Sequence, residues 1–293
     1  MKREELLSSQ FLSRLDRLAF LVKNIRRGRS RGEHGTWRRG SSLEFYDYRA
    51  YEPGDDLRYI DHHIMARLGK LVTKVFSAEE DLTIHFLIDA SASMNFGNPT
   101  KLLYACRLCA ALSYIGIMNL DRVGITWFKE SPVKTLPPMR GRNMFPILDF
   151  LSGIEAGGTT GFNRSLSECA GRTDIPGLAV VISDLLVEEG YMDGLASLVY
   201  HHWDVVLFHL MDRNEYAPDF QGEVRLQDAE TDRQLDLVVD SGIRKKLKES
   251  MNSYAARIER FCLDKSIEYV PVRTDKPFEK AILAYLEKGR YLR

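Results

Sequence analysis

Apolar runs and helical periodicities alternate along the chain from about residue 81 to its end. Short apolar runs typical of strands fall near residues 83–88, 122–128, 178–183, 204–210 and 267–272. Helices are predicted between them, at roughly residues 100–118, 143–153, 163–171, 190–201, 241–264 and 277–288. Because strand and helix alternate, the sequence predicts an α/β fold: a Rossmann-like, doubly wound, mainly parallel sheet with helices on both faces.

Two features refine this domain, which is predicted to span residues 81–293. Residues 178–182 and 205–208 are near-continuous apolar runs, as expected of strands that are buried on both faces. Residues 222–228 and 234–239 alternate and flank a polar turn, which predicts a β-hairpin inserted at about residues 212–240. The polar character of the hairpin favours a position at an edge of the fold.

The first 80 residues follow a different pattern and are predicted to form an N-terminal extension. Residues 1–22 predict an amphipathic helix, since five apolar residues recur at intervals of three or four: Leu7, Phe11, Leu15, Leu18 and Leu21. Residues 23–39 are rich in arginine and broken by glycine. They predict a solvated basic loop; the alternative is an anion-binding arm from Arg26 to Arg39 that contacts a phosphate, a nucleic acid or an acidic protein face.

A β-rich segment completes the extension and turns at a Pro-Gly-Asp sequence between aromatic strands. Its charged residues either pair with one another in a structural corner or form a partner-binding surface. They are Arg49, Asp55, Asp56, Arg58 and Asp61. Both interpretations stay open at the level of the sequence.

The composition of the chain indicates where the protein is located more than what it does. Lys and Arg together number 41, as do Asp and Glu, so no overall field directs the chain toward nucleic acid or membrane. The four cysteines lie in apolar, helix-like runs, and the N-terminus resembles no export signal, which favours a reduced cytoplasmic location. Cys106 and Cys109 form a C-x-x-C without a second pair, so we expect them to be buried rather than to bind zinc. No apolar run approaches the ~20 residues of a membrane span.

The strongest candidate for chemistry is the loop that follows the first predicted strand of the sheet. The apolar run there ends in Asp89, and hydroxyls follow at Ser91 and Ser93. This spacing places one carboxylate and two neutral oxygens at the carboxyl edge of a sheet, where open α/β folds hold their ligands. Oxygen ligands suit a hard divalent cation, so we expect Mg²⁺, or another divalent cation such as Mn²⁺ or Ca²⁺.

Two later segments are predicted to supply further oxygens at the same edge. Gly157 and Gly158 precede Thr159 and Thr160, and glycines let a backbone approach a bound ion closely. A second apolar strand ends in Asp184. In this order the three segments resemble the von Willebrand factor A-like domains, whose metal-ion-dependent adhesion site uses Asp-x-Ser-x-Ser, a distant Thr and a distant Asp.

That resemblance implies a ligand set for the cation in this chain. Asp89, Ser91 and Ser93 correspond to the first motif, Thr159 to the second and Asp184 to the third. Thr159 is preferred over Thr160 because it directly follows the two glycines, and Thr160 is then a partner-facing residue. In that family the serines and the threonine contact magnesium, and the aspartates bind it directly or through water.

Nearly the whole chain resembles a bacterial family, the domain-of-unknown-function-58 proteins, which are von Willebrand A-like. The likeness covers the segment from Arg49 to Asp61, the metal motif and the Ile182-Ser183-Asp184 run. It implies a partnership with AAA+ ATPases of the MoxR type, thought to mature or remodel protein complexes. The chain is therefore expected to be a non-enzymatic adaptor, with a client or the ATPase contributing an acidic residue to the metal.

Two other classes of function remain as alternatives. A metal-dependent phosphoryl-transfer or hydrolytic enzyme would use Asp89, but a phosphatase of the haloacid-dehalogenase type needs a second Asp where Ser91 stands, and no G-x-S-x-G elbow frames a serine nucleophile. Nucleic-acid binding would depend on the basic arm alone, without aromatic stacking residues. No Walker motif is present, so ATP hydrolysis by this chain is not expected.

Overall fold

The computed structural model describes residues 43–78, 82–172, 176–218, 221–231 and 233–287, together with part of an N-terminal helix at residues 11–18. The predicted basic arm, Leu7 and Leu21 lie outside the described residues. The chain divides into a smaller unit at residues 29–81 and a larger unit that combines the N-terminal helix with residues 82–293.

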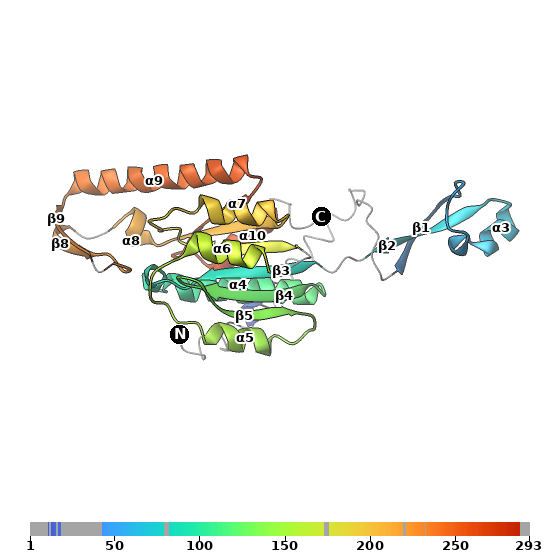
Figure 1. The fold of residues 1–293 in the computed structure, drawn as a ribbon, viewed down its shortest axis with the longest axis horizontal. Helices are drawn as coiled ribbons and strands as arrows, with labels where there is room; N and C mark the ends of the chain where they lie inside the picture. The colour runs from blue at the N-terminus through green and yellow to red at the C-terminus, as the bar shows by residue number, and fades with distance from the viewer. Residues whose placement is uncertain are drawn as a thin grey trace. The chain divides into compact units, whose positions relative to one another are not determined.

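A six-stranded sheet forms the centre of the larger unit (Figure 1). Its strand order is β10-β7-β6-β3-β4-β5, and all neighbours are parallel except the antiparallel pair β4 and β5. The bounds are β3 (Thr83–Asp89), β4 (Arg122–Phe128), β5 (Pro132–Met139), β6 (Leu178–Ser183), β7 (Asp204–Met211) and β10 (Glu268–Arg273). The predicted mainly parallel sheet and its five apolar strands are confirmed.

Strand β5 is the element of the sheet that the sequence pattern did not predict. It lies at the edge of the sheet, and most of its side chains are exposed or half-buried. It also contains Pro132, Pro137 and Pro138, which lack the N–H that an interior strand must donate. An edge position accommodates these prolines, whereas the apolar criterion finds only strands that are buried on both faces.

Helices cover both faces of the sheet (Figure 1). On one face pack α4 (Lys101–Met118), α5 (Phe145–Ser152) and α10 (Phe278–Glu287). On the other pack α6 (Phe162–Ala170), α7 (Met192–Tyr200) and α9 (Ser241–Asp264). Successive residues of each central strand point to opposite faces, so Phe86 and Ile88 join the first core and Leu87 joins the second.

The N-terminal helix belongs to this larger unit, whereas the sequence predicted it as part of the extension of residues 1–80. Phe11, Leu15 and Leu18 are buried in the core formed by α4 and α10. The ring of Phe11 lies 5.7 Å from that of Phe278, and Arg14 pairs with Glu279. The described apolar residues of the helix therefore pack on the sheet domain.

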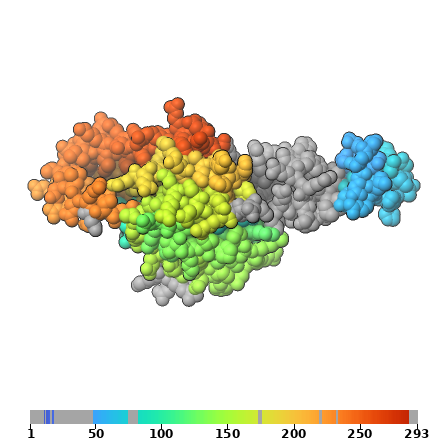
Figure 2. Space-filling view, viewed as in Figure 1, coloured from blue at the N-terminus to red at the C-terminus, as the bar shows by residue number. Residues whose placement is uncertain are grey.

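The inserted hairpin is confirmed, with β8 (Gly222–Gln227) antiparallel to β9 (Gln234–Val239). It forms its own two-stranded sheet and does not extend an edge of the six-stranded one. A short helix, α8 (Arg213–Tyr216), precedes it, and the long helix α9 follows it. In the space-filling view the hairpin (orange) and α9 (red) form the surface at one end of the larger unit (Figure 2).

The smaller unit pairs β1 (Leu43–Ala50) with β2 (Val72–Ala78) around a 3-10 turn η1 (Leu57–Tyr59) and helix α3 (His62–Leu68). Its charged residues pair with one another: Arg49 with Asp55, Arg58 with Asp56 and Lys74 with Asp61. Asp61 also caps α3, and hydrogen bonds from the Ile64 N–H and from Lys74 lower its pKa to about 2. The structural-corner interpretation thus accounts for all five predicted residues, and their role in partner binding stays a prediction.

Helix α4 explains two features of the sequence at once. Cys106 and Cys109 are buried in it with free thiols, and burial raises the pKa of Cys106 to about 12, which fits a structural role for both. Within the described residues, α4 is also the one helix long and apolar enough to cross a membrane, so the expectation that no apolar run approaches that length was wrong. Because most of it is buried inside the protein, core packing accounts for its apolar composition.

Candidate metal centre

Three segments that are distant in sequence meet at the carboxyl edge of the sheet. Strands β3 and β6 are neighbours in register, so Asp89 at the end of one lies beside Ser183 at the end of the other. The Gly157 N–H donates to the Ala90 carbonyl at 3.0 Å, and the Ala92 N–H donates to the Gly158 carbonyl at 3.0 Å. These hydrogen bonds hold the Gly-Gly-Thr-Thr loop against the Asp-x-Ser-x-Ser loop.

Asp89 is completely buried and is held by neutral donors on both carboxylate oxygens. The Ser91 N–H donates to Oδ1 at 2.9 Å, and the Ser183 hydroxyl donates to Oδ2 at 2.7 Å. Burial, together with the negative charge of Asp184, raises the pKa of Asp89 to about 7. A cation bound beside Asp89 would favour the charged form of this buried carboxylate.

The two serines of the motif face each other across a short turn. Their hydroxyl oxygens lie 3.0 Å apart, Ser91 is buried and Ser93 is half-buried. Ser91 precedes the 3-10 turn η2 (Ala92–Asn95), and the buried side chain of Met94 anchors that turn in the core. The loop thus presents the Asp89 carboxylate and two hydroxyls from a fixed backbone.

The two threonines differ in exposure and in contacts. Thr159, the predicted ligand, is exposed, whereas Thr160 is nearly buried. The Thr160 N–H donates to one carboxylate oxygen of Glu230 at 3.1 Å, and its hydroxyl donates to the other at 2.9 Å. The assignment of Thr159 as the ligand stays a prediction, and Thr160 is the one that contacts an acid.

Asp184 lies at the same edge but is already engaged by the protein. Its Oδ2 accepts a hydrogen bond from the Lys101 ammonium at 2.6 Å, and its Oδ1 accepts one from the Leu186 N–H at 3.1 Å. Lys101 is completely buried and also pairs with Glu215. Burial lowers the pKa of Lys101, but the charges of Asp184 and Glu215 outweigh that effect and raise it.

The residues at this edge fit a hard divalent cation. The atoms that could coordinate such an ion are all oxygens: the Asp89 carboxylate, the Ser91 and Ser93 hydroxyls and a threonine hydroxyl. No group of three or more His, Cys, Asp or Glu side chains suited to a metal occurs among the described residues, so a cation here would depend on hydroxyl ligands. Because the Lys101 ammonium already pairs with the Asp184 carboxylate, whereas only neutral groups hold Asp89, Asp184 would act on such an ion through water.

Sequence reasoning did not identify Lys101, Glu215 or Glu230 as parts of this edge. Lys101 is the residue after the N-cap Thr100, in a helix that is otherwise mostly apolar. Glu215 belongs to the capping box that begins α8 at Asp212, a pattern visible in the sequence. Glu230 lies 70 residues from Thr160, and only the fold brings the two together.

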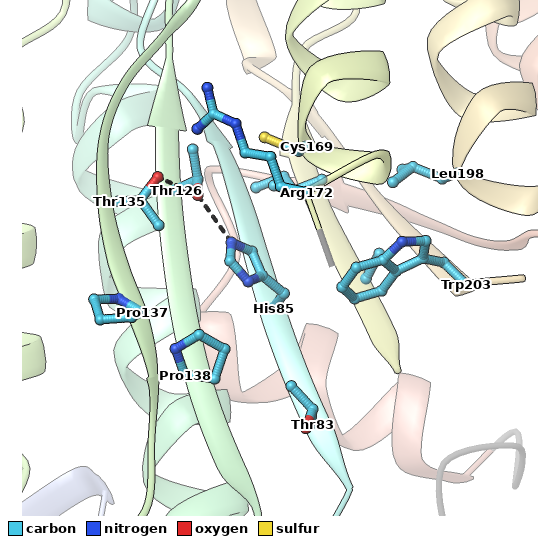
Figure 3. A pocket seen from close by; sticks show the side chains of 12 residues that line it. Thr83, His85, Thr126, Thr135, Pro137, Pro138, Cys169, Arg172, Leu198 and Trp203 are labelled. Carbon is cyan, nitrogen blue, oxygen red and sulfur yellow. Dashed lines mark hydrogen bonds between the residues drawn. The ribbon is translucent and has the colours of Figure 1, made fainter. Parts of the chain in front are cut away.

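Two histidines lie within strands of the sheet, and one of them contacts the backbone of Asp184. His209 is buried and hydrogen-bonds the Tyr269 hydroxyl at 2.8 Å and the Asp184 carbonyl at 3.1 Å. His85 faces a largely apolar cavity of about 210 Å³ and hydrogen-bonds Thr126 at 2.8 Å (Figure 3). Burial lowers the pKa of each to about 4, so both rings are neutral at pH 7 and are satisfied by protein partners.

A family model described as "Protein of unknown function DUF58" matches residues 47–257. The chain belongs to the DUF58 family. This DUF58 protein is 24% identical to the "Uncharacterized protein Mb1516" of Mycobacterium bovis and to the "Uncharacterized protein Rv1480" of Mycobacterium tuberculosis, each over 297 residues that cover 99% of the chain and 93% of the relative.

Two solved structures are similar to this DUF58 protein over 71% of its length. They are the conserved hypothetical protein BatB from Bacteroides thetaiotaomicron and an aerotolerance-related membrane protein from Bacteroides fragilis. The first is 16% identical with a TM-score of 0.44 over 98% of its chain, and the second is 17% identical with a TM-score of 0.44 over 99%.

Proposed function

We propose that this DUF58 protein is a cytoplasmic, non-enzymatic interaction module whose edge binds a divalent cation, Mg²⁺ in the first place, in the manner of a von Willebrand A-like adhesion site. The ligands are Asp89, Ser91, Ser93 and Thr159, with Asp184 acting through water. One observation supports this above all: a completely buried Asp89 shares the edge with two converging serine hydroxyls and the Gly157–Thr160 loop.

The chemistry of these ligands explains why such a site would bind a partner. Mg²⁺ prefers six oxygen ligands and gives up its waters reluctantly, so a site with one direct carboxylate leaves positions that a Glu or Asp of another protein can fill. That contact is charge-assisted and directional, and it fixes the orientation of a docking surface. The proposed partners are a MoxR-type AAA+ ATPase and its client protein.

The contacts of Ser91 support binding over nucleophilic catalysis. Its backbone N–H donates to Asp89 and its hydroxyl pairs with Ser93, so these contacts supply no histidine base. His209 is itself held by Tyr269 and the backbone of Asp184. The described groups thus favour a module that holds a ligand over one that transforms it.

Removal of the metal tests this proposal directly. The purified full chain, immobilised and incubated with a purified MoxR-type ATPase from the same organism, is expected to retain at least about tenfold more ATPase in Mg²⁺ than in a chelator, because the ion supplies the anchoring charge. Adding back Mg²⁺ should restore retention, and circular dichroism should show the same fold in both buffers. Equal retention with and without the ion would contradict the proposal.

A further inference from the structure

The carboxylate of Glu230 is fixed at the edge of the candidate metal centre by two hydrogen bonds. Each oxygen accepts from a different donor of Thr160, at 3.1 Å from the N–H and at 2.9 Å from the hydroxyl. Thr160 is nearly buried, and Glu230 is half-buried. A paired acceptor geometry of this kind orients a carboxylate as well as attracting it.

The turn that carries Glu230 is preorganised by local hydrogen bonds. The carboxylate of Asp228 accepts from the Glu230 N–H at 2.9 Å and from the Thr231 N–H at 2.7 Å. This arrangement closes the β8–β9 turn and fixes the backbone from which Glu230 extends. The hairpin therefore presents the Glu230 side chain from a backbone that local hydrogen bonds hold in place.

The hairpin strands themselves are poorly packed against the protein. Most side chains of β8 and β9 are exposed, and the buried one is Val239 at the end that leads into α9. A second polar link joins Arg233 to Glu188 at 3.2 Å, between two side chains that are both more than 70% exposed. Exposed ion pairs contribute little to stability. The polar contacts that hold the turn at the edge are therefore weak, and the carboxylate of a partner can replace that of Glu230.

The position of Thr160 ties this contact to the metal centre. It follows Thr159 directly, and the preceding Gly158 carbonyl accepts a hydrogen bond from Ala92, between the two serines of the motif. A carboxylate on Thr160 thus lies at the same loop that the proposed partner acid must reach. Thr160 is also the residue of this loop that the sequence predicts to face a partner.

We infer that Glu230 occupies, in the free protein, the place beside Thr160 that a partner's carboxylate takes in the complex. A partner then docks by displacing the hairpin turn with an acidic loop of its own. This inference rests on the proposed function and deepens it by naming the partner's recognition element. Because Glu230 is tethered, it competes at a high effective concentration, and the apparent affinity for an external carboxylate falls with the fraction of time that the edge is free.

The test compares Glu230→Ala with the wild type and with Glu223→Ala, a matched control for an exposed glutamate on the same hairpin. Each Mg²⁺-saturated full chain is titrated with glutarate, which offers only carboxylates, and binding is followed at the Thr160 amide by two-dimensional NMR. We expect Glu230→Ala to bind glutarate about tenfold more tightly than the other two proteins, and only with Mg²⁺ present.

The possible results separate this inference from the proposed function. Equal, Mg²⁺-dependent binding of glutarate by all three proteins would overturn the competitor role of Glu230 and leave the metal centre standing. Binding that is tighter in Glu230→Ala but independent of Mg²⁺ would support displacement of the turn and contradict the metal. Absence of glutarate binding in all three proteins, although Mg²⁺ binds, would overturn both the competitor role of Glu230 and the proposal that the metal centre receives a partner's acid.

Discussion

Replacing Lys101 with methionine is expected to lower the free energy of unfolding by about 3–5 kcal/mol, the usual cost of removing one partner from a buried ion pair. Lys101 is completely buried, and its ammonium contacts both Asp184 and Glu215. Methionine keeps much of the volume but leaves two acidic side chains in a region closed to solvent. Urea unfolding followed by circular dichroism measures the loss.

Two comparisons make this prediction specific to the buried charges. Lys245 lies on the exposed face of α9 and is four-fifths exposed, so Lys245→Met should change stability by less than about 0.5 kcal/mol. Adding Asp184→Asn and Glu215→Gln to Lys101→Met should recover a large part of the loss, because the uncompensated charges are then gone. A loss below about 1 kcal/mol for Lys101→Met alone would show that the cluster is solvated and not closed.

Replacing Asp89 is expected to lower the affinity for Mg²⁺ or Mn²⁺ by at least about 100-fold, since even outer-sphere groups of metal sites are worth up to that factor. Asp89 is the one candidate carboxylate ligand whose oxygens are held only by neutral donors. Asp89→Ala removes the carboxylate, and Asp89→Asn keeps its shape without its charge. Isothermal titration calorimetry measures the affinity, and a pull-down measures retention of the ATPase.

The same variants should remain folded, because the two cores of the sheet do not depend on this carboxylate. Circular dichroism should match the wild type, and Asp89→Asn preserves an acceptor for the Ser183 hydroxyl if the alanine variant unfolds. Asp193→Asn, at an exposed position on α7, serves as the matched control and should bind metal normally. Undiminished metal affinity in both Asp89 variants would contradict the assigned ligand set.

The strands that could be predicted from the sequence are those whose residues are buried on both faces of the sheet. Strands β6 and β7 are apolar on both faces because helices cover both sides of the sheet, and this composition identified them without a structure. Strand β5 escaped because an edge strand with three prolines lacks that signature. The N-terminal helix was recognised from the spacing of its apolar residues. That spacing indicates that one face of the helix is buried, but it does not indicate which domain buries it.

The candidate site was predictable in part for a similar reason. Asp89, Ser91 and Ser93 are close in sequence, and the rule that parallel strands end at one edge brought Asp184 to them. The contacts of Lys101 with Asp184 and of Glu230 with Thr160 span 83 and 70 residues. No spacing rule connects such distant positions. The positive charge of Lys101 beside Asp184 and the carboxylate of Glu230 beside Thr160 could therefore be found only in the folded chain.

The most direct test of the account is the position of Mn²⁺ in a crystal of the full chain, located by its anomalous scattering. We expect one strong peak at the end of β3, about 2.2 Å from the Ser91 and Ser93 hydroxyl oxygens, in contact with the Asp89 carboxylate and with at least one water or external acid. A peak elsewhere, or no peak at this edge at millimolar Mn²⁺, would contradict it.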